Sequence, residues 1–372
     1  MTTALVCGLG TVGLPFALAL PRVGVDHLVL VDFDRVEARN VAVQPYLPEQ
    51  VGMLKVEAAR ALLRAASPVR VDVVADDVRV LGIGALTRAD LLVACPDNRA
   101  AELALGRAAS LLGRPYLRLA TAWRGASVTL VPRPGSDGEP CSGCLLTADD
   151  VRLANVRESC LATLEHNPDA GVPTSSPMGA LAAALAADAV SHAELAPARL
   201  ITLRGGTEPR LSTTPLTASP GCRLHPFPFR HGPVPWRPVP ATTTLAELVA
   251  LAATTLATPN GDLIAEADVP LCPARVCGGA CGRSLGPAFM TFTRQGLWCP
   301  DCGGPVVQEA LPARWTLEAT DLLALGRVPL AALHPPAGLG LRFATAAGAT
   351  CGLHAECSEV ELRQEADDEA LE

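Results

Sequence analysis

The sequence predicts an α/β fold, in which helices cover both faces of a doubly wound, mostly parallel sheet, followed by a smaller cysteine-rich domain. Three observations lead to this prediction. Short apolar segments alternate with helix-like segments through the first third of the chain. A glycine-rich turn joins the first strand to the first helix. Further along, this alternation gives way to proline-rich segments and to closely spaced cysteines.

The first elements form a βαβ unit. A strand at Thr3–Val6 leads into the turn Gly8-Leu9-Gly10-Thr11-Val12-Gly13, a helix at Leu14–Leu20 and a buried strand at His27–Val31, which ends before Asp32. A GxGxxG turn with an acidic residue about 20 positions later is the pattern of Rossmann-like nucleotide-binding sheets. The elements that continue the sheet are a helix at Val56–Ala66, strands at Val69–Val74 and Ala89–Ala94, a helix at Arg99–Leu112 and a strand at Val128–Val131.

The later sequence predicts a domain boundary. An irregular stretch at Asp149–Pro177 precedes an alanine-rich helix at Met178–Ala193. Proline and aromatic residues then crowd His225–Pro240, which is typical of an extended tether. The predicted division is an N-terminal domain over residues 1–225, a proline-rich linker over 226–242, a C-terminal domain over 243–360 that begins with a helix, and a disordered acidic tail over 361–372.

The composition argues against several classes of protein. A formal net charge of −8 argues against a general nucleic-acid-binding protein, whose surface would be basic. Charge or proline interrupts every apolar segment before it reaches membrane-spanning length, and no basic leader precedes the first strand. We therefore expect a cytoplasmic protein with no membrane partner and no nucleic-acid partner. In that reducing compartment, the paired cysteines among the 13 indicate metal sites rather than disulfides.

The only lysine of the chain, Lys55, lies among residues typical of a nucleotide site. The glycines of the turn let the backbone approach a phosphate, and Asp32 ends its strand where a ribose hydroxyl would need an acceptor. Lysine is a compact charge on a flexible stem, suited to a phosphate that moves during a reaction. A GC-rich genome, which favours arginine codons, would explain the same scarcity of lysine.

Taken together, the motifs of the first domain resemble the ThiF/MoeB family, whose members adenylate ubiquitin-like and sulfur-carrier proteins. The resemblance covers roughly Ala4–His225. It rests on the glycine turn, Asp32-Phe33-Asp34, Asn40, Gln44, Gly52-x-x-Lys55 and Cys95-Pro96-Asp97-Asn98. It implies an ATP site formed by Gly8, Gly10, Gly13, Asp32, Asp34, Asn40, Gln44, Lys55, Asp97 and Asn98.

The resemblance also implies an activity. Asn40 and Lys55 would hold the triphosphate, and Asp97 would hold Mg²⁺, while a carrier's C-terminal carboxylate attacks the α-phosphate. The implied partners are a small ubiquitin-like or sulfur-carrier protein, a conjugating enzyme and a second copy of the chain. Plainer alternatives stay open: Asp32 as the acid of a nicotinamide site, Asn40 as a turn residue and Asp97-Asn98 as a helix cap.

Two departures from the family pattern matter. Val43 stands where relatives have an arginine before Gln44, so one phosphate-binding guanidinium is missing. The family's N-terminal arm, which carries an arginine into a partner's site, is absent before Gly8. Arg35 or Arg39 are the nearby substitutes. The alternatives to an active carrier-adenylating enzyme are a weakened scaffold that binds a carrier or conjugating protein, and an adenylyltransferase of another carboxylate, such as that of a peptide.

The cysteines predict two structural Zn²⁺ sites. Relatives commonly carry two CxxC pairs where this chain has Cys141, Cys144, Cys222 and His225, which would form a Cys₃His set. The alternative is that His225 is an ordinary surface residue. A second set, Cys277, Cys281, Cys299 and Cys302, predicts a zinc ribbon, with Cys272 as an alternate ligand.

Four other residues do not fit these sets. Cys160 lies in the irregular stretch, where relatives that form a thioester place a cysteine, so it is a candidate nucleophile. The alternative for Cys160 is an isolated thiol without activation. Cys351, His354 and Cys357 are expected to be buried or surface residues rather than a third metal site.

Overall fold

The protein is described by a computed structural model that covers residues 2–97, 99–122, 124–134, 138–145, 175–192, 195–219, 222, 234–272, 275–285, 288–289, 299–308, 314–318, 322, 339–345, 347 and 349–356. Its contacts separate two compact units. Unit 1 holds the described residues within 1–78 and 89–225, and unit 2 holds those within 79–88 and 226–360. The predicted acidic tail lies outside the described residues, as do Asn98, Cys160, His225 and Cys357.

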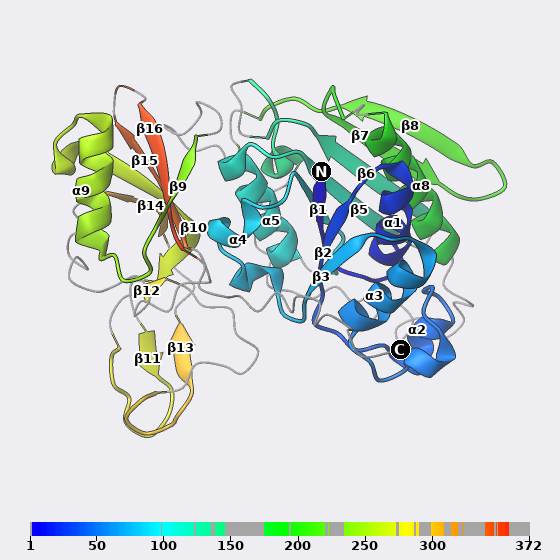
Figure 1. Cartoon of the computed structure of the whole chain (residues 1–372), viewed down its shortest axis with the longest axis horizontal. Helices are drawn as coiled ribbons and strands as arrows, with labels where there is room; N and C mark the ends of the chain where they lie inside the picture. Colours follow the sequence, from blue (N-terminus) through cyan, green and yellow to red (C-terminus); the bar gives the residue numbers. More distant parts are fainter. Residues whose placement is uncertain are drawn as a thin grey trace. The chain divides into compact units, whose positions relative to one another are not determined.

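Unit 1 is built on an eight-stranded sheet in the order β3-β2-β1-β4-β5-β6-β7-β8 (Figure 1). The strands are β1 (Thr3–Cys7), β2 (His27–Val31), β3 (Arg70–Val74), β4 (Leu91–Ala94), β5 (Tyr116–Ala122), β6 (Gly125–Val131), β7 (Arg199–Arg204) and β8 (Arg210–Pro215). Strands β1 to β5 pair in parallel, and β6, β7 and β8 extend the sheet in antiparallel fashion. The chain order reverses between β1 and β4, which is where open α/β sheets bind ligands. The predicted fold class is confirmed.

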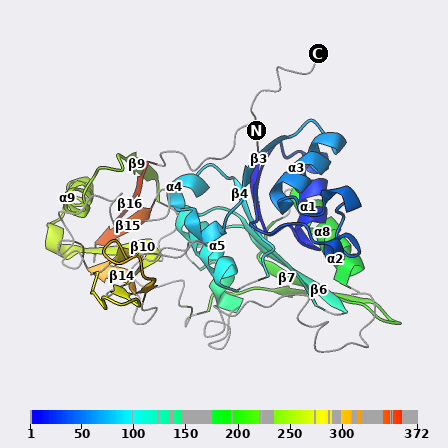
Figure 2. The same ribbon diagram turned by 90° about the horizontal axis from the view of Figure 1, so that it is seen from below.

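Helices cover both faces of this sheet. The helices are α1 (Gly13–Ala19), α2 (Ala38–Val41), α3 (Lys55–Ala66), α5 (Arg99–Leu112) and α8 (Ser175–Ser191), with short 3₁₀ turns at Leu20–Val23, Pro48–Gln50, Val78–Val80 and Ser142–Leu145. Helices α1, α3 and α8 lie on one face, and α5 packs against β4 and β5 on the other (Figures 1 and 2). Leu14 and Phe16 of α1 are completely buried, and each such side chain stabilises the fold by about 2 kcal/mol.

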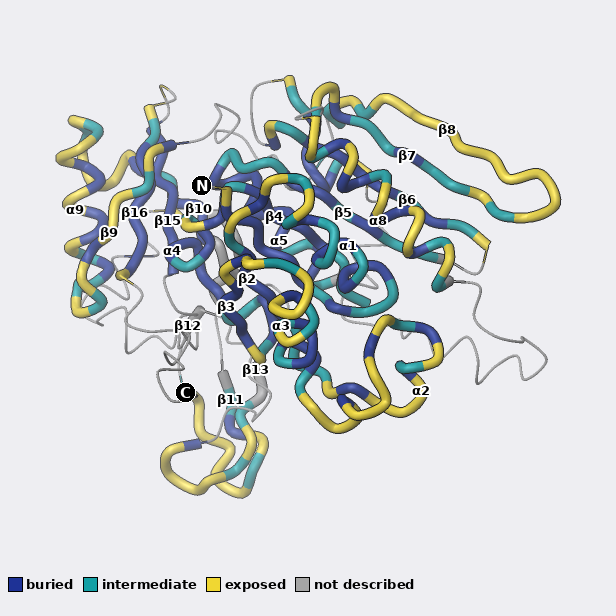
Figure 3. The backbone as a smooth tube through the Cα atoms, turned by 45° about the vertical axis from the view of Figure 1, so that its right-hand side comes forward, coloured by how far each residue is buried: buried dark blue, intermediate teal, exposed yellow. Residues whose placement is uncertain are grey.

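Three strands of this sheet, β5, β7 and β8, are absent from the sequence-based prediction. β5 carries Arg118 among apolar residues, and the charge interrupts the pattern expected of a buried strand. β8 is exposed at all six residues, so it has no buried face to produce an alternating pattern (Figure 3). It is held by backbone pairing with β7, from Arg204↔Arg210 to Arg199↔Pro215.

Unit 2 contains a six-stranded sheet in the order β12-β10-β15-β16-β9, with β14 also paired to β10. The strands are β9 (Trp236–Val239), β10 (Leu263–Cys272), β12 (Ala288–Phe289), β14 (Arg314–Glu318), β15 (Gly340–Thr345) and β16 (Thr350–Ala355). Helix α9 (Leu245–Leu256) covers this sheet and begins at a capping box, in which Thr244 Oγ1 accepts from the Glu247 N–H at 3.2 Å. A 3₁₀ turn at Asn260–Asp262 precedes β10, and β11 (Arg275–Cys277) pairs with β13 (Val306–Gln308) in a separate ribbon.

Two segments of unit 2 come from unexpected parts of the sequence. β9 lies within the predicted linker, and it pairs in parallel with β16. Helix α4 (Ile83–Leu86) lies between β3 and β4 in the sequence, yet residues 79–88 belong to unit 2, where α4 contacts β16. Within the described part of the chain, none of the helices combines the length and hydropathy needed to cross a lipid bilayer.

Candidate functional site

A cavity of about 1090 Å³ lies in unit 1, and its lining includes residues from the carboxyl ends of β1, β2 and β4. Eight of the residues that the sequence analysis assigns to nucleotide binding line it: Gly8, Gly10, Asp32, Asp34, Asn40, Gln44, Lys55 and Asp97. Gly13 is assigned to the same site but is not part of the lining. The strand order explains the convergence, because the loops after parallel strands meet at one edge of the sheet.

The glycine turn is shaped by close backbone approaches. Gly8 has φ +87°, and a Cβ at this residue would lie 2.4 Å from the carbonyl oxygen of Cys95. A Cβ at Gly13 would lie 1.8 Å from the carbonyl oxygen of Gly8. These two glycines therefore let the turn fold back on itself and against the end of β4. Among the described residues, the atom nearest to the Cβ position of Gly10 is Gln44 Nε2, at 3.9 Å.

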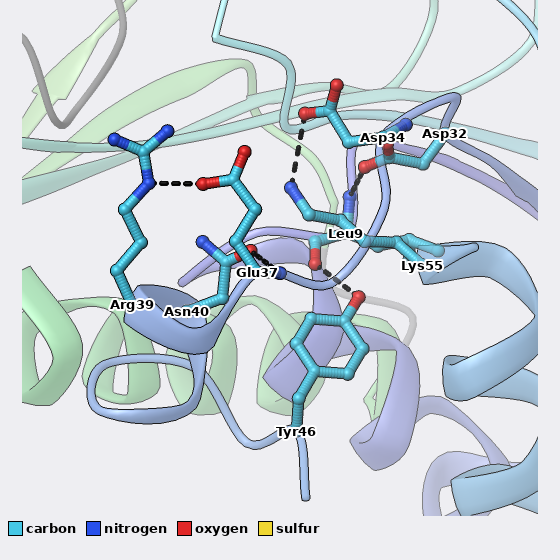
Figure 4. Close-up of polar contacts among 8 residues, drawn as sticks. All are labelled: Leu9, Asp32, Asp34, Glu37, Arg39, Asn40, Tyr46 and Lys55. Atoms are coloured by element: carbon cyan, nitrogen blue, oxygen red, sulfur yellow. Dashed lines mark hydrogen bonds and ion pairs between the residues drawn. The ribbon is translucent and has the colours of Figure 1, made fainter. Parts of the chain in front are cut away.

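Asp32 fixes this turn to the end of β2. Its two carboxylate oxygens accept hydrogen bonds from the backbone N–H groups of Leu9 at 2.7 Å and Asp34 at 2.8 Å (Figure 4). Burial raises the pKa of Asp32 above its ordinary value, while the charge of Lys55 and the two N–H groups act in the opposite direction. The carboxylate thus has a structural function that the sequence analysis did not anticipate.

Lys55 is held at the cavity before any ligand arrives. It is the first residue of α3, only 8% exposed, and its Nζ lies 3.2 Å from Asp34 Oδ2 (Figure 4). Its backbone N–H donates to the Asp34 carbonyl at 2.8 Å. Two contacts to the same residue restrict where the ammonium group can go. The arrangement presents one positive charge to an anion bound by the glycine turn.

Asn40 and Tyr46 brace the loop opposite the glycine turn. Asn40 Oδ1 accepts from the Glu37 N–H at 2.8 Å, so the amide nitrogen is the group that can donate to a phosphate. The Tyr46 hydroxyl donates to the Leu9 carbonyl at 2.8 Å, a contact that sequence reasoning missed. Gln44 Oε1 is buried on the cavity wall and has no hydrogen-bond partner among the described residues. A bound hydroxyl would satisfy this acceptor.

Val43, which stands where relatives have a phosphate-binding arginine, also lines the cavity. Both arginines named as substitutes lie on the wall. Arg39 forms an ion pair with Glu37, and Arg35 Nη1 donates to the Gly52 carbonyl at 2.7 Å. Each guanidinium is therefore already held by a protein acceptor. A carboxylate holds Arg39, and a backbone carbonyl holds Arg35.

The floor of the cavity carries two thiols of low reactivity. Burial raises the pKa of Cys95 to about 12, and burial also raises the pKa of Cys7 well above its ordinary value. Both thiols stay protonated near neutral pH, so they act as apolar wall. Asp97 follows Cys95 after β4 and lines the same cavity, where one carboxylate beside substrate phosphates is a usual Mg²⁺ arrangement.

The far wall of the cavity is formed by β5, β6 and β7, and the sequence analysis assigned none of its residues to the site. It contributes three arginines, Arg118, Arg124 and Arg204. Arg118 Nε lies 2.5 Å from Glu102 Oε1, a carboxylate in the first turn of α5 that also lines the cavity. The pairing joins residues that are 16 positions apart in the sequence.

Two cysteine clusters lie outside the cavity lining. In unit 1, Cys141 Sγ lies 4.0 Å from Cys144 Sγ and 3.6 Å from Cys222 Sγ. Backbone N–H groups point at these sulfurs, from Gly143 to Cys141 at 3.3 Å and from Ser219 to Cys144 at 3.3 Å. His225, the fourth predicted ligand, lies outside the described residues.

The second cluster closes the β11–β13 ribbon of unit 2. Its four sulfurs lie within 4.8 Å of one another, and they belong to Cys277, Cys281, Cys299 and Cys302. A tetrahedral zinc ion bonded to four thiolates at ~2.3 Å would separate the sulfurs by about 3.8 Å. The closest pairs here are 3.4 to 3.7 Å apart, so the donor set can hold zinc. The Gly304 N–H lowers the pKa of Cys302 to about 7, which favours the thiolate.

Cys351 and His354 are not part of either metal-ligand cluster found among the described residues, and the side chain of Cys272, the alternate ligand, lies outside what the structure describes. Cys351 and His354 are buried in β16, and His354 Nδ1 lies 3.0 Å from the Ala355 carbonyl oxygen. Cys272 is the last residue of β10.

Comparison with known proteins identifies relatives of this chain. A profile of the ThiF family matches residues 1–281. Ubiquitin-like modifier-activating enzyme 5 of Xenopus laevis is 30% identical over 206 residues, 51% of this chain and 50% of that protein. The adenylyltransferase and sulfurtransferase uba4 of Emericella nidulans is 31% identical over 237 residues, 59% of this chain and 47% of that protein. The chain thus spans about half the length of the curated relatives it matches.

Solved structures of E. coli MccB also resemble the chain. The complex with MccA-N7isoASN has a TM-score of 0.47 and 22% identity, covering 60% of this chain and 67% of MccB. The complex with ATP has a TM-score of 0.46 and 20% identity, covering 60% of this chain and 66% of MccB.

Proposed function

The chain belongs to the ThiF family, and on this premise we propose that it is an enzyme that uses ATP to adenylate the C-terminal carboxylate of a small ubiquitin-like or sulfur-carrier protein. The observation that carries the proposal is the cavity in which Lys55 faces the glycine turn at the ends of β1 and β4. The names of the two curated relatives, a modifier-activating enzyme and an adenylyltransferase, support the same chemistry.

The proposed reaction is an in-line displacement at phosphorus. A carboxylate oxygen of the carrier bonds to the α-phosphorus, the bond from that phosphorus to the bridging oxygen breaks, and pyrophosphate leaves with the electron pair. Lys55 offsets the charge that grows on the leaving group, and the amide group of Asn40 donates to the phosphates. Asp97 would hold Mg²⁺, which draws charge from the phosphate oxygens. The glycine turn and the N-terminus of α1 supply backbone N–H groups.

Further steps and partners belong to the same proposal. The thiolate of Cys160 would attack the acyl-adenylate, form a thioester and release AMP, before a conjugating enzyme accepts the carrier. A non-reducing gel with Cys160→Ala as the control tests this step through the loss of a thiol-sensitive adduct. We further propose a homodimer, and a cytoplasmic location because paired thiols remain available to metal in a reducing compartment.

The test is exchange of labelled pyrophosphate into ATP, with candidate carriers encoded near the gene. We expect exchange that requires both the carrier and its free C-terminal carboxylate, because the reverse reaction needs the acyl-adenylate. A carrier whose C-terminal carboxylate is amidated is the control. Measurable carrier binding without exchange would reject the enzyme and favour a binding scaffold, for which Val43 on the cavity wall is the supporting observation. Exchange driven by a short peptide alone would favour a peptide-adenylating enzyme.

We expect about two zinc ions per chain, one at each cysteine cluster, when metal content is measured by mass spectrometry. Cys144→Ser and Cys302→Ser should each lower the zinc content by about one equivalent, since each removes a thiolate from a different cluster. Cys351→Ser is the matched control, because this buried thiol of β16 lies outside both clusters. A Cys302→Ser protein that retains the full zinc content would contradict the ribbon site.

A further inference from the structure

The wall of the cavity at the ends of β2, β3 and β4 carries acidic groups together with Lys55, Arg35 and Arg39, whereas the wall formed by β5, β6 and β7 carries positive charges alone. The loops after β2, β3 and β4 contribute Asp32, Asp34, Asp76, Asp77 and Asp97. The wall formed by β5, β6 and β7 contributes three arginines and, among the described lining residues, no acidic side chain. The nucleotide would occupy the side of Lys55 and the glycine turn. The arginine wall therefore faces the part of the cavity that remains for the second substrate.

Arg118 is the most enclosed of these arginines, because its side chain lies on the face of β5 that α5 covers. Leu117 and Leu119 point into the main hydrophobic cluster of unit 1. Alternation along the strand places Arg118 on the opposite face, together with Tyr116, whose hydroxyl contacts the Glu102 carbonyl in α5 at 3.5 Å. The side chains of Arg118 and Glu102 are only 19% and 10% exposed. Both groups still reach the cavity surface.

The Arg118–Glu102 pair is poorly explained as a stabilising contact. A buried ion pair gains little net stability, because both charges lose their hydration. The geometry is also incomplete: Arg118 Nε lies 2.5 Å from Glu102 Oε1, but the two groups are not aligned as a hydrogen bond. Glu102 has a second source of stabilisation, since it lies in the first turn of α5, where the helix dipole favours a negative charge. A carboxylate of a bound substrate can therefore bind part of the Arg118 guanidinium with little loss of stability.

We propose that Arg118 binds the reacting carboxylate of the substrate and orients it toward the α-phosphate, with Glu102 holding the guanidinium in place beforehand. The inference rests on the proposed adenylation and deepens it, because it assigns a residue to the carrier rather than to ATP. An arginine fork can grip one carboxylate oxygen while the other attacks phosphorus. Small residues line the same wall, namely Ala120, Gly125, Ala126, Ser127 and Gly205. They leave room for an extended chain end with small side chains next to its carboxylate.

The direct test is binding of a short peptide that ends in Gly-Gly, either with a free carboxylate or amidated, to protein saturated with a non-hydrolysable ATP analogue. Calorimetry should show that the free carboxylate binds about tenfold more tightly than the amide, as expected for one charge-assisted contact. Arg118→Met should remove this preference. Glu102→Gln should increase it, because the glutamine keeps an oxygen that can position the guanidinium but removes the negative charge that competes with the substrate carboxylate. If the Arg118–Glu102 pair were purely structural, the two substitutions would not change the preference for the free carboxylate in opposite directions.

Controls separate binding from folding. Arg118→Met removes the cation paired with Glu102 at 2.5 Å, so the double variant Arg118→Met with Glu102→Gln removes both charges and should also lack the preference. Arg114→Met is the matched control, because Arg114 pairs with Asp90 at 3.4 Å outside the cavity lining. Equal affinity of the wild-type protein for both peptides, absence of binding, or a preference that persists in the folded Arg118 variants would overturn the proposal.

Pyrophosphate exchange then distinguishes this inference from the function on which it rests. Absence of exchange with every carrier, together with an Arg118-dependent carboxylate preference, would reject the adenylation and leave the carboxylate site. Where exchange occurs, Arg118→Met should raise the KM for the carrier about tenfold and leave the KM for ATP within about twofold. Exchange with an unchanged carrier KM would reject the role of Arg118 and leave the adenylation standing.

Discussion

Lys55→Ala is expected to lower carrier-dependent pyrophosphate exchange by about a thousandfold, because it removes a positive charge placed where the leaving group gains negative charge. The side chain is enclosed, with 10% exposure, and its Nζ lies 3.2 Å from Asp34 Oδ2. As the only lysine of the chain, it can be replaced without a neighbouring lysine taking its place. The measurement is the exchange rate at saturating ATP and carrier, with a thermal melt to show that the variant is folded.

Lys55→Arg is the matched control for this prediction. It keeps the charge but replaces a compact ammonium group by a wide planar fork, and the site beside Asp34 is nearly closed. We expect activity between that of the wild-type protein and that of Lys55→Ala. Near-normal exchange in Lys55→Ala would mean that the lysine has no part in the reaction, and that its position reflects codon usage alone.

Gly13→Ala is expected to reduce the free energy of unfolding of unit 1 by about 3 kcal/mol. The added methyl group would lie 1.8 Å from the Gly8 carbonyl oxygen and 3.1 Å from Cys95 Cβ, so the turn and the end of β4 must move apart. Thermal or urea unfolding of the purified variant measures the loss. Because the turn itself is displaced, ATP binding should weaken in the protein that remains folded.

Gly10→Ala separates the two functions of the turn. The nearest atom to its Cβ position is Gln44 Nε2 at 3.9 Å, an ordinary contact, so stability should change by less than about 1 kcal/mol. Gly10 lines the cavity, however, and a methyl group there would occupy space next to the phosphates. We expect weaker ATP binding with an unchanged melting temperature. Equal loss of stability in both variants would contradict this division of roles.

Local sequence patterns were sufficient to predict the main strands and helices in the first half of unit 1. The bounds predicted for the strand at His27–Val31 and the helix at Arg99–Leu112 agree with β2 and α5. Both segments are bounded by clear local features, since Asp32 follows the apolar run of β2 and the pair Pro96-Asp97 precedes the start of α5. β5, β7 and β8 were missed because their position depends on sheet pairing, and the exposed edge strand β8 has no apolar face to reveal it.

The same distinction applies to the site. Residues that follow a strand end, such as Gly8, Asp32 and Asp97, could be placed on one edge of the sheet from topology alone. The Arg118–Glu102 pair could not, because it depends on how α5 packs over β5. The two metal-ligand clusters were accessible from the spacing of their cysteines, since zinc sites use short, regular loops.

Helix α4 has a consequence for how this chain can be divided. Residues 79–88 lie between β3 and β4 in the sequence but belong to unit 2. There the completely buried Ile83 packs tightly against Gly340, where an added Cβ would lie 2.7 Å from Ile83 Cβ. A fragment that ends at residue 225 would keep this apolar segment and lose the strands that cover it. Truncation at residue 225 therefore does not separate the two units cleanly, because part of unit 2 is encoded within the sequence of unit 1.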